Sequence, residues 1–153
     1  DATLFWLAKM ISAGEDPKYI FRRLLISASE DIGMADPNAI VVVNSCSNAF
    51  DRVGFPEGKY FLAQASLYLA ISSKSNSVQV ISEVINNLEF QDMSFVPDHL
   101  CNNSTTYINP HKSPSEAKKQ SYLPPNYKKE QIWKPSISGW EKRKYDQLRK
   151  NLD

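Results

Sequence analysis

The sequence has few of the residues that build a metal centre or a disulfide framework. It contains two cysteines, Cys46 and Cys101, and two histidines, His99 and His111. The cysteines lie far apart and follow no metal-ligand spacing, so we expect two free thiols in a reducing cytoplasm. His99 and Cys101 could supply two metal ligands, but nothing nearby completes a site. This favours a hydrogen-bonded loop histidine and predicts no metal site.

Motifs that carry catalysis are missing as well. No glycine-rich loop ends in Gly-Lys-Ser or Gly-Lys-Thr, so nothing predicts a cradle for nucleotide phosphates. No Gly-x-Ser-x-Gly elbow and no histidine pair at helical spacing occurs. Glu30 and Asp31 are adjacent, and adjacent helical side chains point about 100° apart. We expect them to pair structurally, with Arg23 or with a neighbouring element, and we predict no catalytic residue and no cofactor site in this chain.

No apolar run approaches the roughly 20 residues that a membrane span needs, and no signal peptide opens the chain. The sequence begins directly in an amphipathic pattern, which suggests a piece cut at a domain boundary. Its 153 residues are enough for one domain with a sizeable core. With 42% hydrophobic and 23% charged residues, the composition is that of a soluble globular chain.

The net charge of +1 conceals an asymmetry along the chain. Residues 1–111 hold seven Lys and Arg against twelve acidic residues, whereas residues 112–153 hold eleven against five. A basic tail of this kind could contact phosphates, or it could lie over the acidic helical body. The second interpretation, or a solvated tail, is favoured.

Two helices with clear boundaries are predicted between residues 1 and 33. In the first, apolar residues recur at the spacing of one helical face, and Gly14 is suited to the left-handed conformation that ends a helix. Asp16 stands where an N-cap carboxylate accepts backbone N–H groups, with Pro17 in the first turn. The second helix follows and ends before Gly33.

Three more helices are expected over residues 37–53, 57–72 and 76–91. The first begins after Asp36 and ends at Gly54, with Cys46 on its apolar face as a small buried hydrophobic residue. Residues 57–72 leave almost no polar face. Such a helix is either central in the core or shared with another subunit.

Beyond Asp92, proline at positions 97, 110, 114, 124, 125 and 135 argues against long regular elements. We expect an extended segment over the helices, anchored by four aromatic residues: Tyr107, Tyr122, Tyr127 and Trp133. A charged helix is predicted over residues 139–152. The domain is thus expected to have a helical core over residues 1–100, with residues 101–153 packed on it.

The opening stretch resembles a known family. The runs W-L-A-x-M, A-G-E-D-P, R-R-L and A-S-E-D-I-G-x-A-D-P, which span Trp6 to Pro37, closely resemble the C-terminal region of the MgsA/RarA proteins. These are replication-associated recombination AAA+ ATPases related to the Werner-helicase-interacting protein. Later segments are similar too: K-S-N at residues 74–76, V-P-D-H-L at 96–100, Q-S-Y-L-P at 120–124 and G-W-E at 139–141.

The resemblance implies an all-α bundle like the clamp-loader collar, with an irregular Pro-rich C-terminal segment and a non-catalytic role in oligomerisation. It implies that ATP and Mg²⁺ bind to an upstream module outside this chain. The implied partners are further copies, as a homotetramer, with DNA and the single-strand binding protein through the full-length protein, and no membrane. The implied location is cytoplasmic and nucleoid-associated.

Five residues are candidates for an interface or for DNA contact. Phe5 and Trp6 suit the core first and an interface second. Arg22 and Arg23 suit a solvated face, a salt link across a subunit boundary or contact with DNA phosphates. An alternative function is therefore a nucleic-acid-binding helical module that uses Arg22, Arg23, Lys74 and the basic tail.

Overall fold

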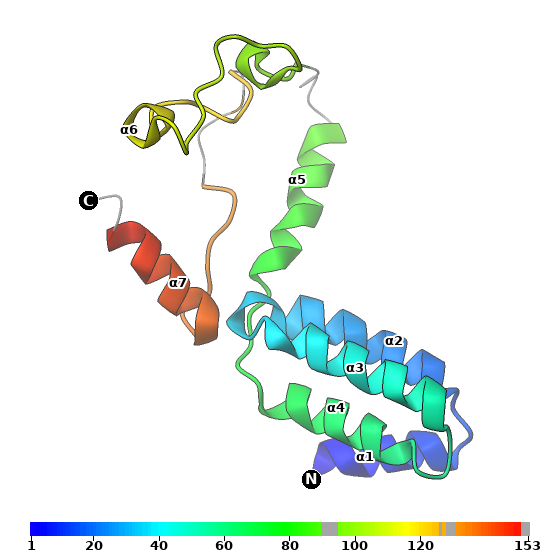
Figure 1. Cartoon of the computed structure of the whole chain (residues 1–153). Helices are drawn as coiled ribbons and strands as arrows, with labels where there is room; N and C mark the ends of the chain where they lie inside the picture. The colour runs from blue at the N-terminus through cyan, green and yellow to red at the C-terminus, as the bar shows by residue number, and fades with distance from the viewer. Residues whose placement is uncertain (90–94, 126, 128–130, 151–153) are drawn as a thin grey trace. The chain divides into compact units, whose positions relative to one another are not determined.

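The structure is a computed structural model, and it describes residues 1–89, 95–125, 127 and 131–150 (Figure 1). This part of the chain is helical and contains no strand, which confirms the predicted all-α fold. The α-helices are α1 (Ala2–Ser12), α2 (Pro17–Ser27), α3 (Asn38–Val53), α4 (Lys59–Ile71), α5 (Val80–Glu89), α6 (Pro114–Ala117) and α7 (Gly139–Lys150).

By its contacts the chain forms two compact units. One comprises Asp1–Ile81 with Trp133–Asp153, and the other comprises Ser82–Ile132. The compact units therefore divide at residues 81 and 132, whereas the sequence placed the boundary at residue 100. Helix α7 belongs to the first unit, together with α1 to α4.

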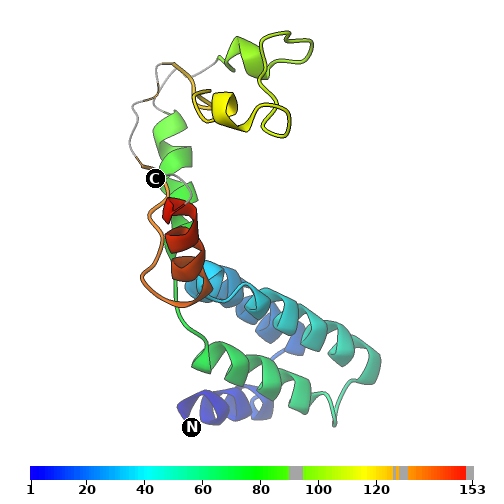
Figure 2. The ribbon, with the colours of Figure 1, turned by 60° about the vertical axis from the view of Figure 1, so that its left-hand side comes forward.

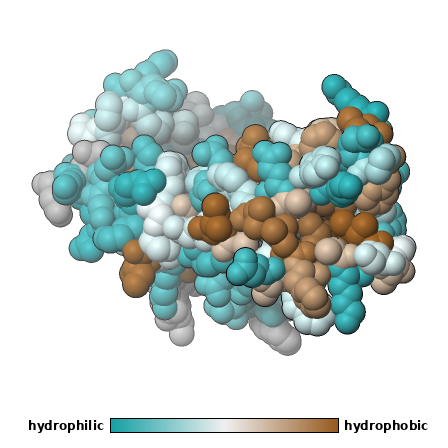
Figure 3. All heavy atoms as spheres, turned by 90° about the horizontal axis from the view of Figure 1, so that it is seen from below, coloured by the Kyte–Doolittle hydropathy of each residue, from teal (hydrophilic) through white to brown (hydrophobic). Residues whose placement is uncertain are grey.

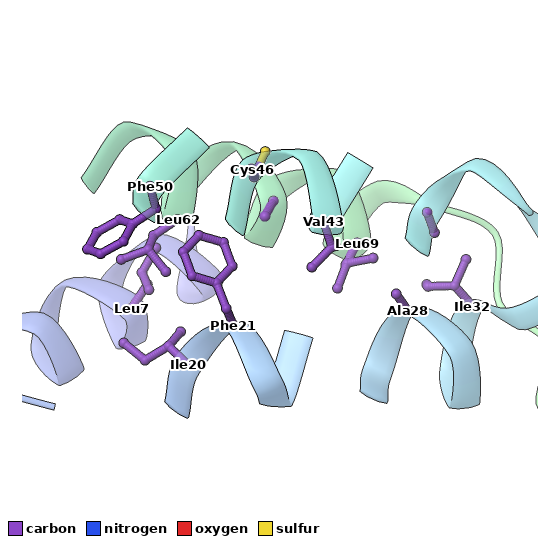
Figure 4. Close-up of a cluster of buried hydrophobic side chains, with 12 residues drawn as sticks. Leu7, Ile20, Phe21, Ala28, Ile32, Val43, Cys46, Phe50, Leu62 and Leu69 are labelled. Carbon is purple, nitrogen blue, oxygen red and sulfur yellow. The ribbon is translucent and has the colours of Figure 1, made fainter. Parts of the chain in front are cut away.

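The core of the first unit lies among α1, α2, α3 and α4, which pack along one another (Figures 1 and 2). Figure 4 shows Phe21 of α2 pointing toward Phe50 of α3 and Leu62 of α4. The rings of Phe21 and Phe50 meet edge to face with centroids 5.7 Å apart. The buried cluster consists of Leu7, Ile20, Phe21, Ala28, Ile32, Ala39, Val43, Cys46, Phe50, Leu62, Ala65 and Leu69.

The predicted helix boundaries are confirmed where the signals are local. Gly14 has φ +80° after α1, and Gly54 has φ +69° after α3. The Asp16 carboxylate accepts the Lys18 backbone N–H at 2.9 Å, and Pro17 begins α2. Each signal acts within a few residues of the helix end, so the sequence suffices to locate it.

The end of the second helix differs from the prediction. Residues Ala28–Ile32 form a π-helical turn (η1), followed by the 3₁₀ turn η2 (Gly33–Ala35). The Asp31 carbonyl accepts the Ser75 backbone N–H at 2.9 Å, and the Asp31 carboxylate accepts the Ser27 hydroxyl at 2.6 Å. Carbonyls at a helix end need partners from elsewhere, and here a loop far along the chain supplies one.

The helix predicted over residues 76–91 begins as the 3₁₀ turn η3 (Ser77–Gln79) and continues as α5. Its predicted end at Gln91 lies outside the described residues. The last predicted helix is α7, whose expected final residues 151 and 152 also lie outside them.

Helix α7 is held to Ser75 and to η3 by a buried carboxylate, and it approaches η2 at Gly139. Glu141 is 1% exposed and accepts hydrogen bonds from the hydroxyls of Ser75, at 2.6 Å, and Ser77. Trp133 Nε1 donates to the Ser77 hydroxyl at 3.2 Å. At Gly139, an added Cβ would lie 2.2 Å from the Ala35 carbonyl oxygen, so the backbones approach as closely as only glycine permits.

The second unit contains α6 and the 3₁₀ turn η4 (Asp98–Leu100). His99 Nε2 lies 2.7 Å from the Ser121 carbonyl oxygen, so the predicted hydrogen-bonded loop histidine is confirmed. The expected anchors Tyr107 and Tyr122 are 45% and 49% exposed, so that prediction is wrong for them. Trp133 is half-buried, and it belongs to the first unit.

Candidate oligomerisation surface

Helices α1 and α4 present an apolar surface to solvent. We call it the α1–α4 face, and its large exposed residues are Leu4, Phe5, Trp6, Tyr60, Leu67 and Ile71. Figure 3 views the molecule from the side on which Figure 1 draws α1 and α4, and a band of hydrophobic residues crosses it. Monomeric proteins rarely expose large contiguous apolar patches, so this surface is the candidate site.

Helical geometry explains why these residues are exposed. On α4, Leu62, Ala65 and Leu69 enter the core, while Leu67 and Ile71, four residues apart, lie on another side. Ile71 is 83% exposed. Of the two arrangements predicted for an all-apolar helix, central burial is therefore wrong for α4: it contributes one side to the core and presents another to solvent.

The aromatic residues of α1 lie on the outside of the bundle. Phe5 is 62% exposed and Trp6 is 58% exposed, so the core position predicted first for them is wrong. Their rings meet edge to face at 5.3 Å, and the Lys9 ammonium lies 5.3 Å from the Trp6 ring centroid. Only Leu7 of α1 is buried.

A second apolar stripe lies on α5. Ile81, Ile85 and Leu88 follow one another at helical spacing and are 58%, 50% and 47% exposed. This stripe is shorter than the α1–α4 face and contains no aromatic residue.

The basic candidates lie on α2 and after α4. Arg22 and Arg23 are exposed, and the Arg22 guanidinium lies 5.8 Å from the Tyr19 ring centroid. Lys74 Nζ donates to the carbonyls of Leu69 and Ser72 at 2.5 and 2.9 Å. Lys74 thereby binds the carbonyl end of α4, where a cation also suits the helix dipole.

The acidic pair predicted to bind Arg23 has other partners. Glu30 accepts from the Gln79 side-chain amide at 3.1 Å, and Asp31 accepts from Ser27. The ion pair that the described ranges show joins Lys142 to Asp146 within α7. Structural pairing with a neighbouring element is thus confirmed for Glu30, and pairing of these acids with Arg23 is wrong.

A pocket of about 760 Å³ opens at one end of the bundle, between α1, α2, α4 and the loop at residues 74–76. Its lining is aliphatic and hydroxyl-bearing, with Asp31 and Lys74 as the charged members. The Lys74 ammonium already binds two carbonyls, and no histidine or cysteine lines the pocket. Within the lining, the Ser27 hydroxyl donates to the Asp31 carboxylate at 2.6 Å.

Cysteine burial follows the sequence prediction. Cys46 is buried and Cys101 is exposed, and both thiols are free. Burial raises the pKa of the Cys46 thiol. Over the described ranges, no group of three or more metal-ligating side chains occurs. In the same ranges, every helix is too short or too polar to cross a bilayer.

One polar pair was not predicted as such. Asp36 was expected only as a cap, and its carboxylate does accept the Asn38 backbone N–H at 3.2 Å. It also accepts the Tyr68 hydroxyl at 2.8 Å, which ties the start of α3 to α4. This hydrogen bond, with burial and the negative charge of Asp36, raises the pKa of Tyr68. Asp36 and Tyr68 are 32 positions apart, and no local pattern in the sequence predicts a hydrogen bond over that separation.

Comparison with known proteins decides the family. A family model described as "MgsA AAA+ ATPase C terminal" matches residues 1–151. The chain belongs to this MgsA C-terminal family. The resemblance stated from the sequence is thereby confirmed, and it extends over almost the whole chain.

Relatives of this MgsA C-terminal domain include proteins with informative names. Replication-associated recombination protein A of Haemophilus influenzae is 38% identical over 167 residues, covering 97% of this chain and 37% of that protein. Its namesake in Escherichia coli is 51% identical over 78 residues, covering 51% of this chain and 17% of that protein. ATPase WRNIP1 of Dictyostelium discoideum is 38% identical over 106 residues, covering 69% of this chain and 12% of that protein.

The chain spans only part of these relatives. Where it matches over nearly its whole length, it covers 26% to 39% of the relative. The structure explains two segments that carried the resemblance to the MgsA family. K-S-N at 74–76 supplies Ser75, and G-W-E at 139–141 supplies the Glu141 that accepts its hydroxyl.

Proposed function

We propose that this chain is the non-catalytic oligomerisation domain, or collar, of an AAA+ ATPase that acts in replication and recombination. The observation that carries the proposal is the α1–α4 face, on which Phe5, Trp6 and Ile71 are each more than half exposed. In the oligomer, a second copy of the chain covers this face, either with its own α1–α4 face or with another surface. Membership of the MgsA C-terminal family and the names of the relatives support the setting.

Burial of the apolar side chains of the α1–α4 face provides enough free energy for two copies to associate. Full burial of one large apolar side chain contributes roughly 1.5–3 kcal/mol. Association costs an estimated ~4–15 kcal/mol in lost freedom of the partners. Six large side chains, each covered in part, reach this range together, whereas any one of them alone does not.

A collar of this kind acts by holding ATPase modules together. Tethering raises the effective concentration of one module near the next. An arginine of one subunit then reaches the nucleotide of its neighbour, where it stabilises charge in phosphoryl transfer. In this proposal ATP and Mg²⁺ bind to a separate module, a tetramer is the assembly, and DNA and the single-strand binding protein are partners of the whole protein.

Sedimentation velocity of residues 1–153 over a hundredfold range of concentration tests the proposal. We expect the weight-average sedimentation coefficient to rise with concentration toward that of a discrete oligomer. A coefficient that stays at the monomer value up to the highest concentration would contradict it. Circular dichroism of the same samples checks that the chain is folded as helices.

A further inference from the structure

Helix α7 concentrates positive charge. Five of its 12 residues are basic: Lys142, Arg143, Lys144, Arg149 and Lys150. Of its two acidic residues, one is buried and the other offsets one of these charges at the surface. Glu141 is buried, and Asp146 is paired with Lys142 at 2.9 Å.

Two of the basic residues, Arg143 and Lys150, lie on the side of α7 opposite the buried Glu141. Because a helix turns about 100° per residue, Lys150 lies about 180° and Arg143 about 160° around the axis from the buried Glu141. Lys142 and Arg149 lie about 100° and 80° from Glu141, on the flank of the helix. All four side chains are exposed. We call these four residues the α7 basic face.

The helix that bears this face is held in place by hydrogen bonds, a close backbone approach and one aromatic contact. Leu148 is 54% exposed, and Glu141 is the buried residue of α7. Glu141 binds the Ser75 and Ser77 hydroxyls, Gly139 approaches Ala35, and the Tyr145 ring meets the Trp133 ring with centroids 5.9 Å apart. The charges are therefore presented on a fixed scaffold, which lowers the entropy lost on binding.

We infer that the α7 basic face binds the sugar-phosphate backbone of nucleic acid. Arg143 and Lys150 are seven residues apart, which is about 10 Å along a helix. Duplex DNA carries one charge per about 1.7 Å of its axis, so this length faces several phosphates. The face has no exposed aromatic or aliphatic anchor of the kind that dominates protein interfaces, and this disfavours an acidic protein as the occupant.

This inference is independent of the oligomerisation proposal, and it places the nucleic-acid contact in the basic tail, one of the parts of the chain that the sequence offered for it. Lys74 binds the end of α4, and Arg22 lies over Tyr19. Helix α7 has five cations within 12 residues, whereas α2 has three within 11. Binding at α7 therefore favours phosphate contact for the basic tail over the solvated or intramolecular position that the sequence analysis preferred.

Fluorescence anisotropy of a labelled 20-base-pair duplex tests the inference, with the chain titrated at several salt concentrations. The variant R143Q/K150Q is compared with K18Q/R52Q, which removes two exposed charges from α2 and α3 and gives the same net charge. We expect R143Q/K150Q to weaken binding at least tenfold and to reduce the slope of log K against log salt by about two, whereas K18Q/R52Q leaves both nearly unchanged.

Several results would overturn the inference. One is that the unsubstituted chain fails to bind the duplex at low salt, and another is that R143Q/K150Q and K18Q/R52Q lose the same affinity. A third such result is a loss of affinity in R22Q/R23Q alone. Poly-glutamate that competes as well as unlabelled duplex would also overturn it, because the face would then bind any polyanion. Sedimentation of R143Q/K150Q should match that of the unsubstituted chain, so failure here is distinguishable from failure of the oligomerisation proposal.

Discussion

Ser75 and Glu141 are 66 positions apart in the chain, and the Ser75 hydroxyl donates to the buried Glu141 carboxylate at 2.6 Å. The Ser77 hydroxyl donates to the other carboxylate oxygen. The Glu141 carboxylate of α7 is thus the shared acceptor of two hydroxyl groups, and these two hydrogen bonds hold α7 to the chain around η3. Removing a partner from a buried hydrogen bond costs more than the bond itself contributes.

Replacing Glu141 with Ala should lower the free energy of unfolding by about 2–4 kcal/mol, since two hydroxyls lose their acceptor and a cavity forms. Urea unfolding followed by circular dichroism measures the change. Glu116→Ala is the control, because Glu116 is exposed on α6 and should change stability by less than about 0.5 kcal/mol. Equal effects of the two substitutions would contradict the role assigned to Glu141.

Gly139→Ala should destabilise the protein more than Gly14→Ala. Both glycines have positive φ, +68° and +80°, so both substitutions carry the same backbone strain of about 1–2 kcal/mol. At Gly14 an added Cβ meets nothing within 4 Å, whereas at Gly139 it would lie 2.2 Å from the Ala35 carbonyl oxygen. The difference between the stability losses of the two variants therefore measures the effect of the close approach of α7 to Ala35. Equal losses would show that this approach does not contribute to stability.

Tyr68→Phe should lower stability by about 1 kcal/mol at neutral pH, because Asp36 loses a hydrogen-bond donor. Tyr60→Phe is the matched control, since Tyr60 is 64% exposed. The pKa of Tyr68 is raised in the folded state. The stability that Tyr68 contributes is therefore fully present below its ordinary pKa of 10.0, and it is lost as the pH rises through the folded-state pKa. Stability measured from pH 8 to 11 should therefore fall less steeply in Tyr68→Phe than in the unsubstituted chain.

The two thiols should react at different rates with a thiol reagent such as Ellman's reagent. Cys101 is exposed, whereas Cys46 is buried and its pKa is raised, so little thiolate is available to react. We expect one thiol to react within minutes at pH 8 and the second to react only in denaturant. Cys101→Ser should remove the fast phase and leave the slow one, and fast reaction of that variant would contradict the burial of Cys46.

The sequence predicted the parts of the fold that depend on neighbours in the chain. Gly14, Asp16 and Gly54 act within one turn of a helix end, and each boundary lies where its residue predicted. The apolar spacing also identified Cys46 as a core residue. These signals need no knowledge of the tertiary structure.

The remainder depends on contacts between distant residues. The π turn at Ala28–Ile32 accompanies a bond between Asp31 and Ser75, and nothing near Asp31 in the sequence announces it. The apolar composition of α4 could not show which side would be buried. Aromatic residues usually suit the core, so the sequence favours a core position for Phe5 and Trp6 over the exposed position that they have in the structure.

In our proposal, the α1–α4 face brings copies of this chain together. Sedimentation equilibrium of Leu67→Lys/Ile71→Lys, set against Val41→Lys, tests it most directly. Val41 is exposed on α3 and Leu67 and Ile71 are exposed on α4, so all three positions accept lysine without disturbing the core. We expect the α4 variant to be monomeric at concentrations where the unsubstituted chain and Val41→Lys are oligomeric. An α4 variant that associates as tightly as the unsubstituted chain would contradict the account.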